Sequence, residues 1–427
     1  MIKKIFGEAK NLAFSQTAKQ TYITTFGAGI NAFLGFIFTI IVARALSPSD
    51  FGVFAVISSL VLIFLGFSDL GTTAGAMRFI PTVEEKDQKR IIKVIYLVTT
   101  AAAMALSLFL FFASDFFSEI IFKTNNFSFL VKLSSPAILG LSLWTVSCGI
   151  LYAQKKFVRG VLVDTSAVIF KLSVVLLLLF TYRLTLSSTV AAFSLTPFLC
   201  LFLAVIFIPP KFLNSPLEEK LIKQIFSFSA WIFLAKISIT ILGQIDNIML
   251  VNLSGPIATG IYAAANRMTF VFPVVINGLT VVLMPRFAGF NKVEEAKKFL
   301  KKVLLTVGLF IIPIMVLYFL SDILVFWLYG PAYAQASGVF RLLLLRTAFF
   351  LAATGPLTML VYFFGESKIF ALLSIFQALV LVMANFLFIP IFGASGPAIS
   401  GAISYGLVFL AATFIIFKKI KEKSQLI

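Results

Sequence analysis

Residues 369–417 read IFALLSIFQALVLVMANFLFIPIFGASGPAISGAISYGLVFLAATFIIF and contain no charged side chain. A helix that crosses the hydrocarbon core of a bilayer needs about 20 mostly apolar residues. This run is long enough for two such helices, and the small residues between Gly393 and Ala398 mark the start of the second and permit close helix packing. The run therefore predicts two membrane-spanning helices.

The composition of the whole chain points the same way. Hydrophobic residues make up 60% of the 427 positions and charged residues 12%, whereas an ordinary soluble chain has roughly 25% charged residues. The formal net charge of +18 does not indicate a nucleic-acid-binding protein, because the basic residues stand between apolar runs rather than on one polar domain. Cys148 and Cys200 lie inside apolar runs, which predicts reduced thiols buried in the membrane and no disulfide.

Twelve segments are long and apolar enough to span a bilayer, so the sequence predicts an all-α polytopic membrane protein with about twelve transmembrane helices. They lie near residues 20–43, 51–76, 91–113, 128–152, 160–182, 186–208, 226–250, 257–284, 303–325, 338–363, 369–391 and 395–417.

The basic residues indicate which loops face the cytoplasm. Of the 35 lysines and arginines, 26 fall on the termini and on alternate loops, whereas the other loops hold only Arg44, Lys123 and Arg183. Basic loops stay on the cytoplasmic side. We therefore expect both termini in the cytoplasm and a multi-pass protein of the cell (inner or plasma) membrane. Amphipathic stretches within 1–19 and 209–225 would lie on that side, either in the membrane interface or as solvated basic flanks.

The second half of the chain repeats the first at an offset of about 208 residues. The matches follow one order along the chain: Leu46-Ser47 with Leu253-Ser254, Gly52 with Gly260, Asp69 with Asn277, Arg78-Phe79 with Arg286-Phe287, Val83-Glu84-Glu85 with Val293-Glu294-Glu295, and Ser114-Asp115 with Ser321-Asp322. Matching loops lie on the same predicted side, so the two six-helix repeats are expected to be parallel, related by an axis along the membrane normal.

The repeat predicts a domain organisation and a mode of action. The predicted parts are an amphipathic N-terminus (1–19), an N-lobe (20–208), a cytoplasmic linker (209–225), a C-lobe (226–418) and a basic tail (419–427). A transporter of this kind binds its cargo between the lobes in a central cavity and rocks them to alternate access. The alternative is a duplicated scaffold with no transport role.

Enzymatic chemistry finds little support. The chain contains no histidine, which removes Ser-His-Asp catalysis and histidine-ligated metals, and it has no P-loop motif. No outer cluster of acidic residues suits a metal or a lipid-phosphate glycosyl donor. We therefore expect a transporter rather than an enzyme, with no cofactor and no metal.

Charged residues inside spans cost about 2.5–3.5 kcal/mol on insertion scales, so they persist mainly where they face a protein interior or a wet cavity. The basic candidates, predicted to contact an anionic substrate, are Lys171, Lys236, Arg267 and Arg346. The predicted cavity lining consists of Asn31, Thr240, Gln244, Asn247 and Asn277. The acids Asp69, Asp164 and Asp246 are candidates for coupling or for ion pairs.

The seventh span carries the strongest polar pattern, because Lys236, Thr240, Gln244 and Asn247 fall within about 80° of one another at helical spacing. The excess of base over acid predicts a cationic cavity for an anionic cargo. A structural alternative exists for single residues, since Lys171 has Asp164 two turns away and Asp246 has Arg267 on the adjacent helix.

Several motifs resemble those of a known family. They are Ala43 to Ala55 (ARALSPSDFGVFA), Ser68-Asp69-Leu70-Gly71 followed by Ala76-Met77-Arg78, Gln244 to Leu250 (QIDNIML), Gly260 to Ala265 (GIYAAA) and Gly393 to Ala398. In their order they resemble the polysaccharide-unit flippases of the O-antigen (Wzx) type. That family belongs to a superfamily with multidrug and toxin exporters and lipid II flippases. Asn247 departs from the pattern, because a basic residue is expected beside the aspartate.

The resemblance implies two six-helix lobes around a central cavity, as in multidrug and toxin exporters. It also implies movement of an anionic lipid-linked oligosaccharide from the inner to the outer leaflet, with membrane lipids and glycan polymerases or transferases as partners. We expect a monomer and no nucleic acid. The alternatives are a multidrug or small-metabolite exporter of the same fold, and a non-transporting membrane factor of a glycan synthase.

Overall fold

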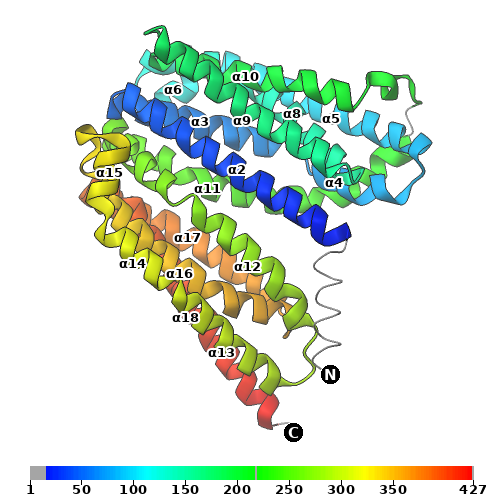
Figure 1. Ribbon diagram of the computed structural model, residues 1–427, viewed down its shortest axis with the longest axis vertical. Helices are drawn as coiled ribbons and strands as arrows, with labels where there is room; N and C mark the ends of the chain where they lie inside the picture. Colours follow the sequence, from blue (N-terminus) through cyan, green and yellow to red (C-terminus); the bar gives the residue numbers. More distant parts are fainter. Residues whose placement is uncertain (1–15, 217–218, 426–427) are drawn as a thin grey trace. The chain divides into compact units, whose positions relative to one another are not determined.

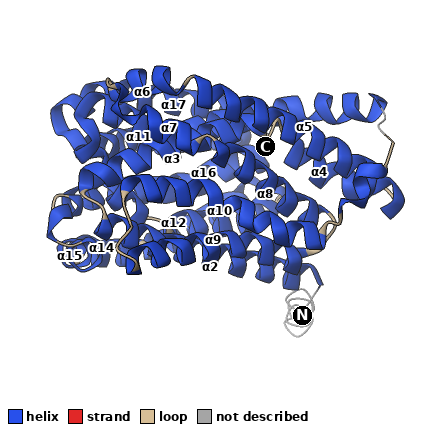
Figure 2. Cartoon of the chain, turned by 90° about the horizontal axis from the view of Figure 1, so that it is seen from above, coloured by secondary structure: helices blue, strands red, loops and turns tan. Residues whose placement is uncertain are grey.

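The computed structural model describes residues 16–216 and 219–425, and within these ranges every regular element is helical (Figure 2). Most of the predicted amphipathic N-terminus, together with Leu217, lies outside the described residues. Eleven segments of the described chain are long and apolar enough to cross a membrane. The last of them, Ser367–Glu422, contains two helices, so the segments overlap all twelve predicted spans. The predicted all-α polytopic membrane fold is confirmed.

Residue contacts divide the chain into two compact units. Unit 1 consists of Met1–Ala45 and Val56–Ile245, and unit 2 of Leu46–Ala55 and Asp246–Ile427. Helices α3 and α11 therefore contribute to both units. The lobe boundaries at 208 and 226, drawn from the sequence repeat, remain a prediction.

Unit 1 is a bundle of long helices with short helical turns between them (Figure 1). Its elements are α2 (Gln16–Ala45), the larger part of α3 (Pro48–Ser68), α4 (Thr72–Phe79), η1 (Ile80–Thr82), α5 (Glu85–Phe112), α6 (Ser114–Phe122), η2 (Asn125–Phe127), α7 (Ser128–Ser134), α8 (Pro136–Ala153), α9 (Phe157–Phe180), α10 (Leu186–Phe207), η3 (Pro210–Asn214) and the first half of α11 (Glu219–Met268).

The core of unit 1 lies where α4, α5 and α8 meet, around the fully buried Ile80, Ile95, Ile150 and Leu151. Helix α10 shows how the ends of these helices are satisfied. The Thr185 side chain accepts a hydrogen bond from the Ser188 amide, and the Ser188 hydroxyl accepts one from the Thr185 amide. This capping box pairs donors that a helix start otherwise leaves open.

Unit 2 is likewise built of long helices with short helical turns between them. It contains the second half of α11, α12 (Val271–Ala288), α13 (Val293–Leu309), α14 (Ile311–Phe319), α15 (Ser321–Tyr329), η4 (Pro331–Tyr333), α16 (Ala336–Tyr362), α17 (Ser367–Phe392), η5 (Gly393–Ser395) and α18 (Gly396–Gln425). The short α6 and α15 begin 207 residues apart, at Ser114 and Ser321, and each is nine residues long. The repeat seen in the sequence thus recurs in the position and length of these two helices.

Prolines account for several breaks within spans. Pro136 follows the break between α7 and α8, Pro273 the break between α11 and α12, and Pro313 the break between α13 and α14. A proline lacks the amide hydrogen and its ring clashes with the carbonyl one turn earlier, so a helix breaks just before it. The seventh and eighth spans are separated instead at Gly255, whose φ of 84° interrupts α11.

Two glycines in unit 2 bring backbones into direct contact. A Cβ atom on Gly52 would overlap the carbonyl oxygen of Pro256, and one on Gly260 would overlap that of Pro48. Pro48 and Pro256, like Gly52 and Gly260, are repeat partners exactly one offset of 208 apart by their residue numbers. The contact is therefore reciprocal, and only glycine permits it.

Replacing Gly260 with valine should destabilise the protein, because the added side chain must push α11 away from the start of α3. We expect a loss of about 1–3 kcal/mol, the usual cost of overpacking, or failure to fold. Thermal denaturation in detergent measures the effect. Gly278→Val is the matched control, since no atom lies within 4 Å of the Cβ it would add. Equal melting temperatures for the two variants would contradict this packing.

Candidate functional site

The span formed by α3 and α4 is broken at Asp69, Leu70 and Gly71. Leu70 and Gly71 have φ values of 44° and 74°, a conformation that favours glycine and is strained for leucine. A Cβ atom on Gly71 would lie 2.6 Å from the carbonyl oxygen of Ser229. The Ser229 hydroxyl donates to the Gly71 carbonyl at 3.0 Å, which satisfies a backbone group exposed by the break.

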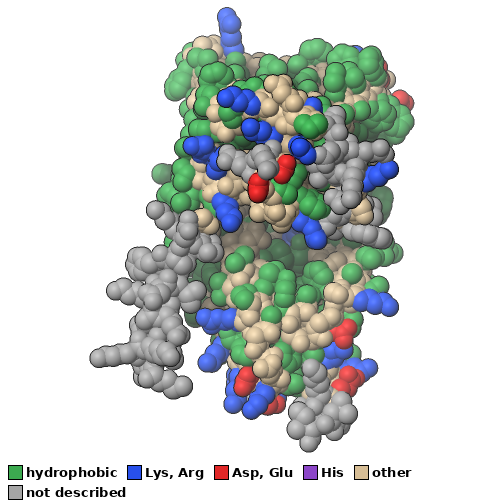
Figure 3. All heavy atoms as spheres, turned by 90° about the vertical axis from the view of Figure 1, so that its right-hand side faces the viewer, with side chains coloured by type: hydrophobic (Ala, Val, Ile, Leu, Met, Phe, Trp, Pro, Cys, Tyr) green, Lys and Arg blue, Asp and Glu red, His purple; other side chains and the backbone are tan. Residues whose placement is uncertain are grey.

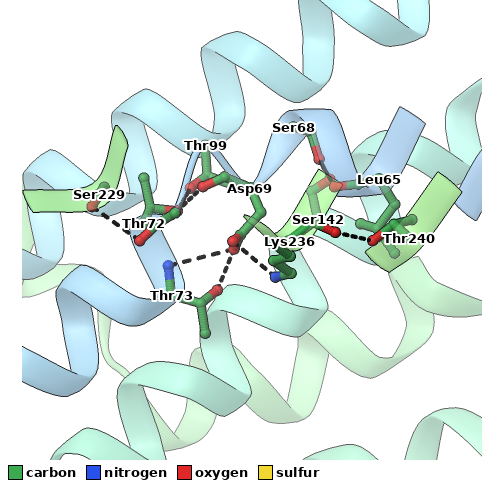
Figure 4. Close-up of polar contacts among 11 residues, drawn as sticks. Leu65, Ser68, Asp69, Thr72, Thr73, Thr99, Ser142, Ser229, Lys236 and Thr240 are labelled. Carbon is green, nitrogen blue, oxygen red and sulfur yellow. Dashed lines mark hydrogen bonds and ion pairs between the residues drawn. The ribbon is translucent and has the colours of Figure 1, made fainter. Parts of the chain in front are cut away.

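This break holds the Asp69 carboxylate against α11. The Lys236 Nζ atom donates to Oδ2 at 2.8 Å, while the Thr73 hydroxyl donates to Oδ1 and the Thr73 amide lies 3.4 Å from it (Figure 4). Only 7% of the Asp69 side chain is exposed, against 40% for Lys236. An ammonium group has three donors. Since Asp69 takes one of them, Lys236 retains donors for a ligand.

A cavity of about 290 Å³ in unit 1 opens beside this ion pair. Its polar lining consists of Ser68, Asp69, Thr99, Ser142, Thr145, Lys236, Thr240 and Gln244. Hydroxyl contacts tie the walls together: the Ser68 and Ser142 oxygens lie 2.5 Å apart, and those of Thr72 and Thr99 lie 2.8 Å apart (Figure 4). The arrangement offers one partly solvated cation and a wall of hydroxyl and amide groups.

The structure thus brings together Asp69, Lys236, Thr240 and Gln244 of the residues selected from the sequence. Asn247, the last residue of the polar stripe, does not line this cavity. Sequence reasoning missed the serines and threonines, which are common inside membrane helices and carry no signal on their own. Their signal is spatial, since they come from α3, α5 and α8.

The second acid of unit 1 lies outside this cavity. The Asn31 amide donates to Asp164 at 2.6 Å, which joins α2 to α9. The Lys171 ammonium lies 4.5 Å from the centroid of the Phe38 ring, a favourable cation–π distance. Asn31, Asp164 and Lys171 therefore form a separate contact between the same two helices.

Unit 2 contains a buried polar cluster around Asp246. Its carboxylate accepts hydrogen bonds from Tyr262 at 2.8 Å and from Asn385 at 2.9 Å, and it pairs with Arg346 at 3.1 Å. The Arg346 guanidinium also donates to the Tyr262 hydroxyl at 3.2 Å. The sequence analysis gave neither Tyr262 nor Asn385 a role in a site. For Asn385 a signal was available, because it is an amide inside the apolar span 369–391.

The sequence offered Arg267 as an alternative partner for Asp246, whereas in the structure the arginine that pairs with Asp246 is Arg346. The turn at Gly255 explains the difference. Asp246 stands nine residues before it and Tyr262 seven after it, whereas Arg267 stands twelve after it. At 1.5 Å per residue, Arg267 lies about 4–5 Å beyond the level of Asp246. The Arg267 Nε atom is buried without a hydrogen-bond partner.

Two adjoining cavities of unit 2 share Ile276, Phe350 and Tyr405. The smaller, about 170 Å³, is lined by Arg346 and Asn266, and the larger, about 420 Å³, by Asn277, Thr280, Ser374 and Gln377. Arg346 lies 5.5 Å from the Tyr405 ring. Within the described residues, no group of three or more cysteine, aspartate or glutamate side chains could hold a metal ion.

Breaking the Asp69–Lys236 pair from either side should destabilise unit 1. Because Lys236 is partly exposed, we expect about 1–3 kcal/mol for Lys236→Met, between the values for surface and buried pairs. Removing both charges in Asp69→Asn/Lys236→Met should cost less than the sum of the single changes, because no lone charge remains. Thermal denaturation of the four proteins measures the coupling, with exposed Lys211→Met as the control. Strictly additive effects would show that the pair contributes nothing.

Comparisons with known proteins place the chain in a family. The sequence model of a family described as "Polysaccharide biosynthesis protein" matches residues 17–291. No curated protein matches the chain.

Solved structures share its fold. An inward-facing multidrug resistance transporter of the MATE family and MOP superfamily is 13% identical, with a TM-score of 0.75 over 92% of this chain and 96% of that one. The lipid II flippase MurJ, in an inward closed conformation, is 15% identical, with a TM-score of 0.73 over 96% and 91%. A MOP superfamily transporter from Pyrococcus furiosus, described as having a binding pocket of reverse polarity, is 14% identical, with a TM-score of 0.63 over 96% and 97%.

These likenesses establish the fold of the MOP superfamily and a multi-pass membrane protein. The family match covers well over half of the sequence. The chain therefore belongs to the polysaccharide biosynthesis protein family.

Proposed function

We propose that the protein is a flippase that moves a polyprenyl-pyrophosphate-linked oligosaccharide from the cytoplasmic to the outer leaflet by alternating access. It would act in the assembly of a cell-surface polysaccharide, such as O-antigen, from the cell membrane and with both termini in the cytoplasm. Family membership and the MOP fold support a transport role in polysaccharide synthesis. The observation that carries the choice of cargo is the Lys236 ammonium, half-exposed beside a hydroxyl-rich cavity.

The charge balance of the cavity favours an anionic cargo. Its one carboxylate, Asp69, is held by Lys236 and by Thr73, so it offers little attraction to an organic cation. Lys236 keeps donors that point away from Asp69, and charge-assisted hydrogen bonds to a pyrophosphate strengthen in a low-dielectric site. Asp69 also offsets the cost of keeping Lys236 within the membrane while no substrate is bound.

Taken by themselves, the cavities of unit 2 contain groups of the kind that bind sugars. Asn277, Gln377 and Tyr405 line the larger cavity, and amide and aromatic groups of this kind bind sugar hydroxyls and sugar faces. Arg346 lies at the narrower end of these cavities. Arg267 and Lys171 remain candidates for the head group, and the lipid tail would stay in the bilayer.

The proposed head-group contact predicts a charge-specific loss of binding in Lys236→Ala. A charge-assisted hydrogen bond contributes about 1.5–3 kcal/mol, so binding of a short-chain polyprenyl-pyrophosphate oligosaccharide should weaken roughly 10- to 100-fold. Binding of the corresponding uncharged polyprenyl glycoside should change little. Lys236→Arg should recover most of the affinity. Isothermal titration calorimetry with the purified protein measures all three.

The matched control is Lys211→Ala, which removes an exposed lysine outside the spans. Melting temperatures of the variants separate lost binding from lost folding. Unchanged affinity for the pyrophosphate compound in a folded Lys236→Ala protein would remove Lys236 from the site.

A further inference from the structure

Another, chemically different groove of unit 2 is lined by residues of α13, α16 and α18. Figure 1 shows where these three helices lie in the fold. Its volume is about 310 Å³. The walls are apolar and come from Leu300 and Leu304 of α13, Pro356 of α16, and Ile416, Phe417 and Ile420 of α18. None of the residues assigned above to head-group or sugar contact lines it.

The packing of α13 explains why the groove exists. A Cβ atom on Gly355 would lie 3.0 Å from Val303 and 3.3 Å from Leu300, so α13 sits close on α16 at this glycine. Helix α18 packs along α16 on the other side and meets α13 only weakly. The space left between α13 and α18 is the groove, and Pro356 of α16 forms part of its wall. The Thr413 hydroxyl oxygen, on the groove wall, is buried without a hydrogen-bond partner.

Large aromatic side chains on and beside the groove wall are exposed. Phe417 on its wall is 64% exposed, and Phe414, one turn earlier on α18, is 72% exposed. Such side chains stand out in a soluble protein but are normal against lipid tails. A hydrocarbon chain is therefore the ligand that the groove itself would take.

The mouth of the groove is basic. Its lining includes the adjacent Lys297 and Lys298 of α13 and Lys301 one turn later, against a single acid, Glu294. Figure 3 shows basic side chains, with a few acidic ones, over the lower end of the view, where Figure 1 has the end of α18 and the start of α13. The positive-inside pattern assigns this end to the cytoplasmic leaflet, whose anionic lipids attract basic residues.

We propose that this groove is a binding site for an anionic phospholipid of the cytoplasmic leaflet. One acyl chain lies along Leu304, Ile416 and Ile420, and the phosphate rests on Lys297, Lys298 and Lys301. The apolar wall alone would accept any lipid, so the lysines carry the preference for a negative head group. Glu294 weakens that preference by its like charge.

Native mass spectrometry of the full chain, titrated with dioleoyl phosphatidylglycerol or dioleoyl phosphatidylcholine, tests the proposal. We expect tighter binding of phosphatidylglycerol, and a roughly tenfold or larger loss of that preference in Lys297→Gln/Lys298→Gln/Lys301→Gln. Glu294→Gln should act in the opposite sense and strengthen it. The control Lys89→Gln/Lys155→Gln/Lys211→Gln removes the same charge from other loops of the predicted cytoplasmic side and should behave as the parent protein.

The groove itself is tested by filling it. Leu304→Trp should lower the affinity for phosphatidylglycerol, whereas Leu305→Trp, at a neighbouring position that is 64% exposed and does not line the groove, should not. Equal binding of the two lipids by the parent protein, or equal effects of the two lysine triples, would overturn the proposal. Preferential displacement of phosphatidylglycerol by a polyprenyl phosphate would overturn it as well, because the occupant would then be the carrier lipid.

Discussion

The ion pair between Asp69 and Lys236 is the interaction on which the organisation of the unit 1 cavity depends. A lone charge at this depth is costly, and so is a broken helix whose backbone groups find no partner. In unit 1, contacts at the helix break offset both of these costs. The break at Leu70 and Gly71 turns the carboxylate towards α11, Ser229 satisfies the freed carbonyl, and Lys236 supplies the opposite charge. Gly66 and Gly243 also line the cavity, and α3 packs closely on α11 at Gly66, where a Cβ atom would lie 3.0 Å from Thr240.

The three acids that the sequence places inside spans share this arrangement. Asp69 is held by Lys236, Asp164 by Asn31, and Asp246 by Arg346, Tyr262 and Asn385. Each carboxylate accepts hydrogen bonds from side chains of its own unit, so its negative charge is partly compensated by the protein itself. Lys236 itself lines the cavity and has donors beyond the one that Asp69 takes. This asymmetry supports the proposed anionic cargo, and the basic mouth of the α13–α18 groove supports the proposed anionic lipid.

The fold could be predicted from the sequence because it depends on properties averaged over long stretches of the chain. Apolar runs, the basic loops and the repeat each summarise many residues, and the helical spacing of Lys236, Thr240 and Gln244 was enough to predict a polar face. Side-chain partners could not be predicted, since they depend on the depth and rotation of helices far apart in sequence. The exchange of Arg267 for Arg346 arises from a few residues of register around Gly255. The hydroxyl lining escaped notice because single serines and threonines in spans carry no periodic signal.

The measurement that tests the central claim most directly is the leaflet accessibility of a labelled polyprenyl-pyrophosphate oligosaccharide in proteoliposomes, probed with an impermeant reagent. The account predicts that the protein exposes the inner pool to the reagent and that Lys236→Ala abolishes this exposure while leaving insertion intact. An inner pool that stays protected as in protein-free liposomes, under a proton or a sodium gradient and with several glycans, would contradict the flippase assignment.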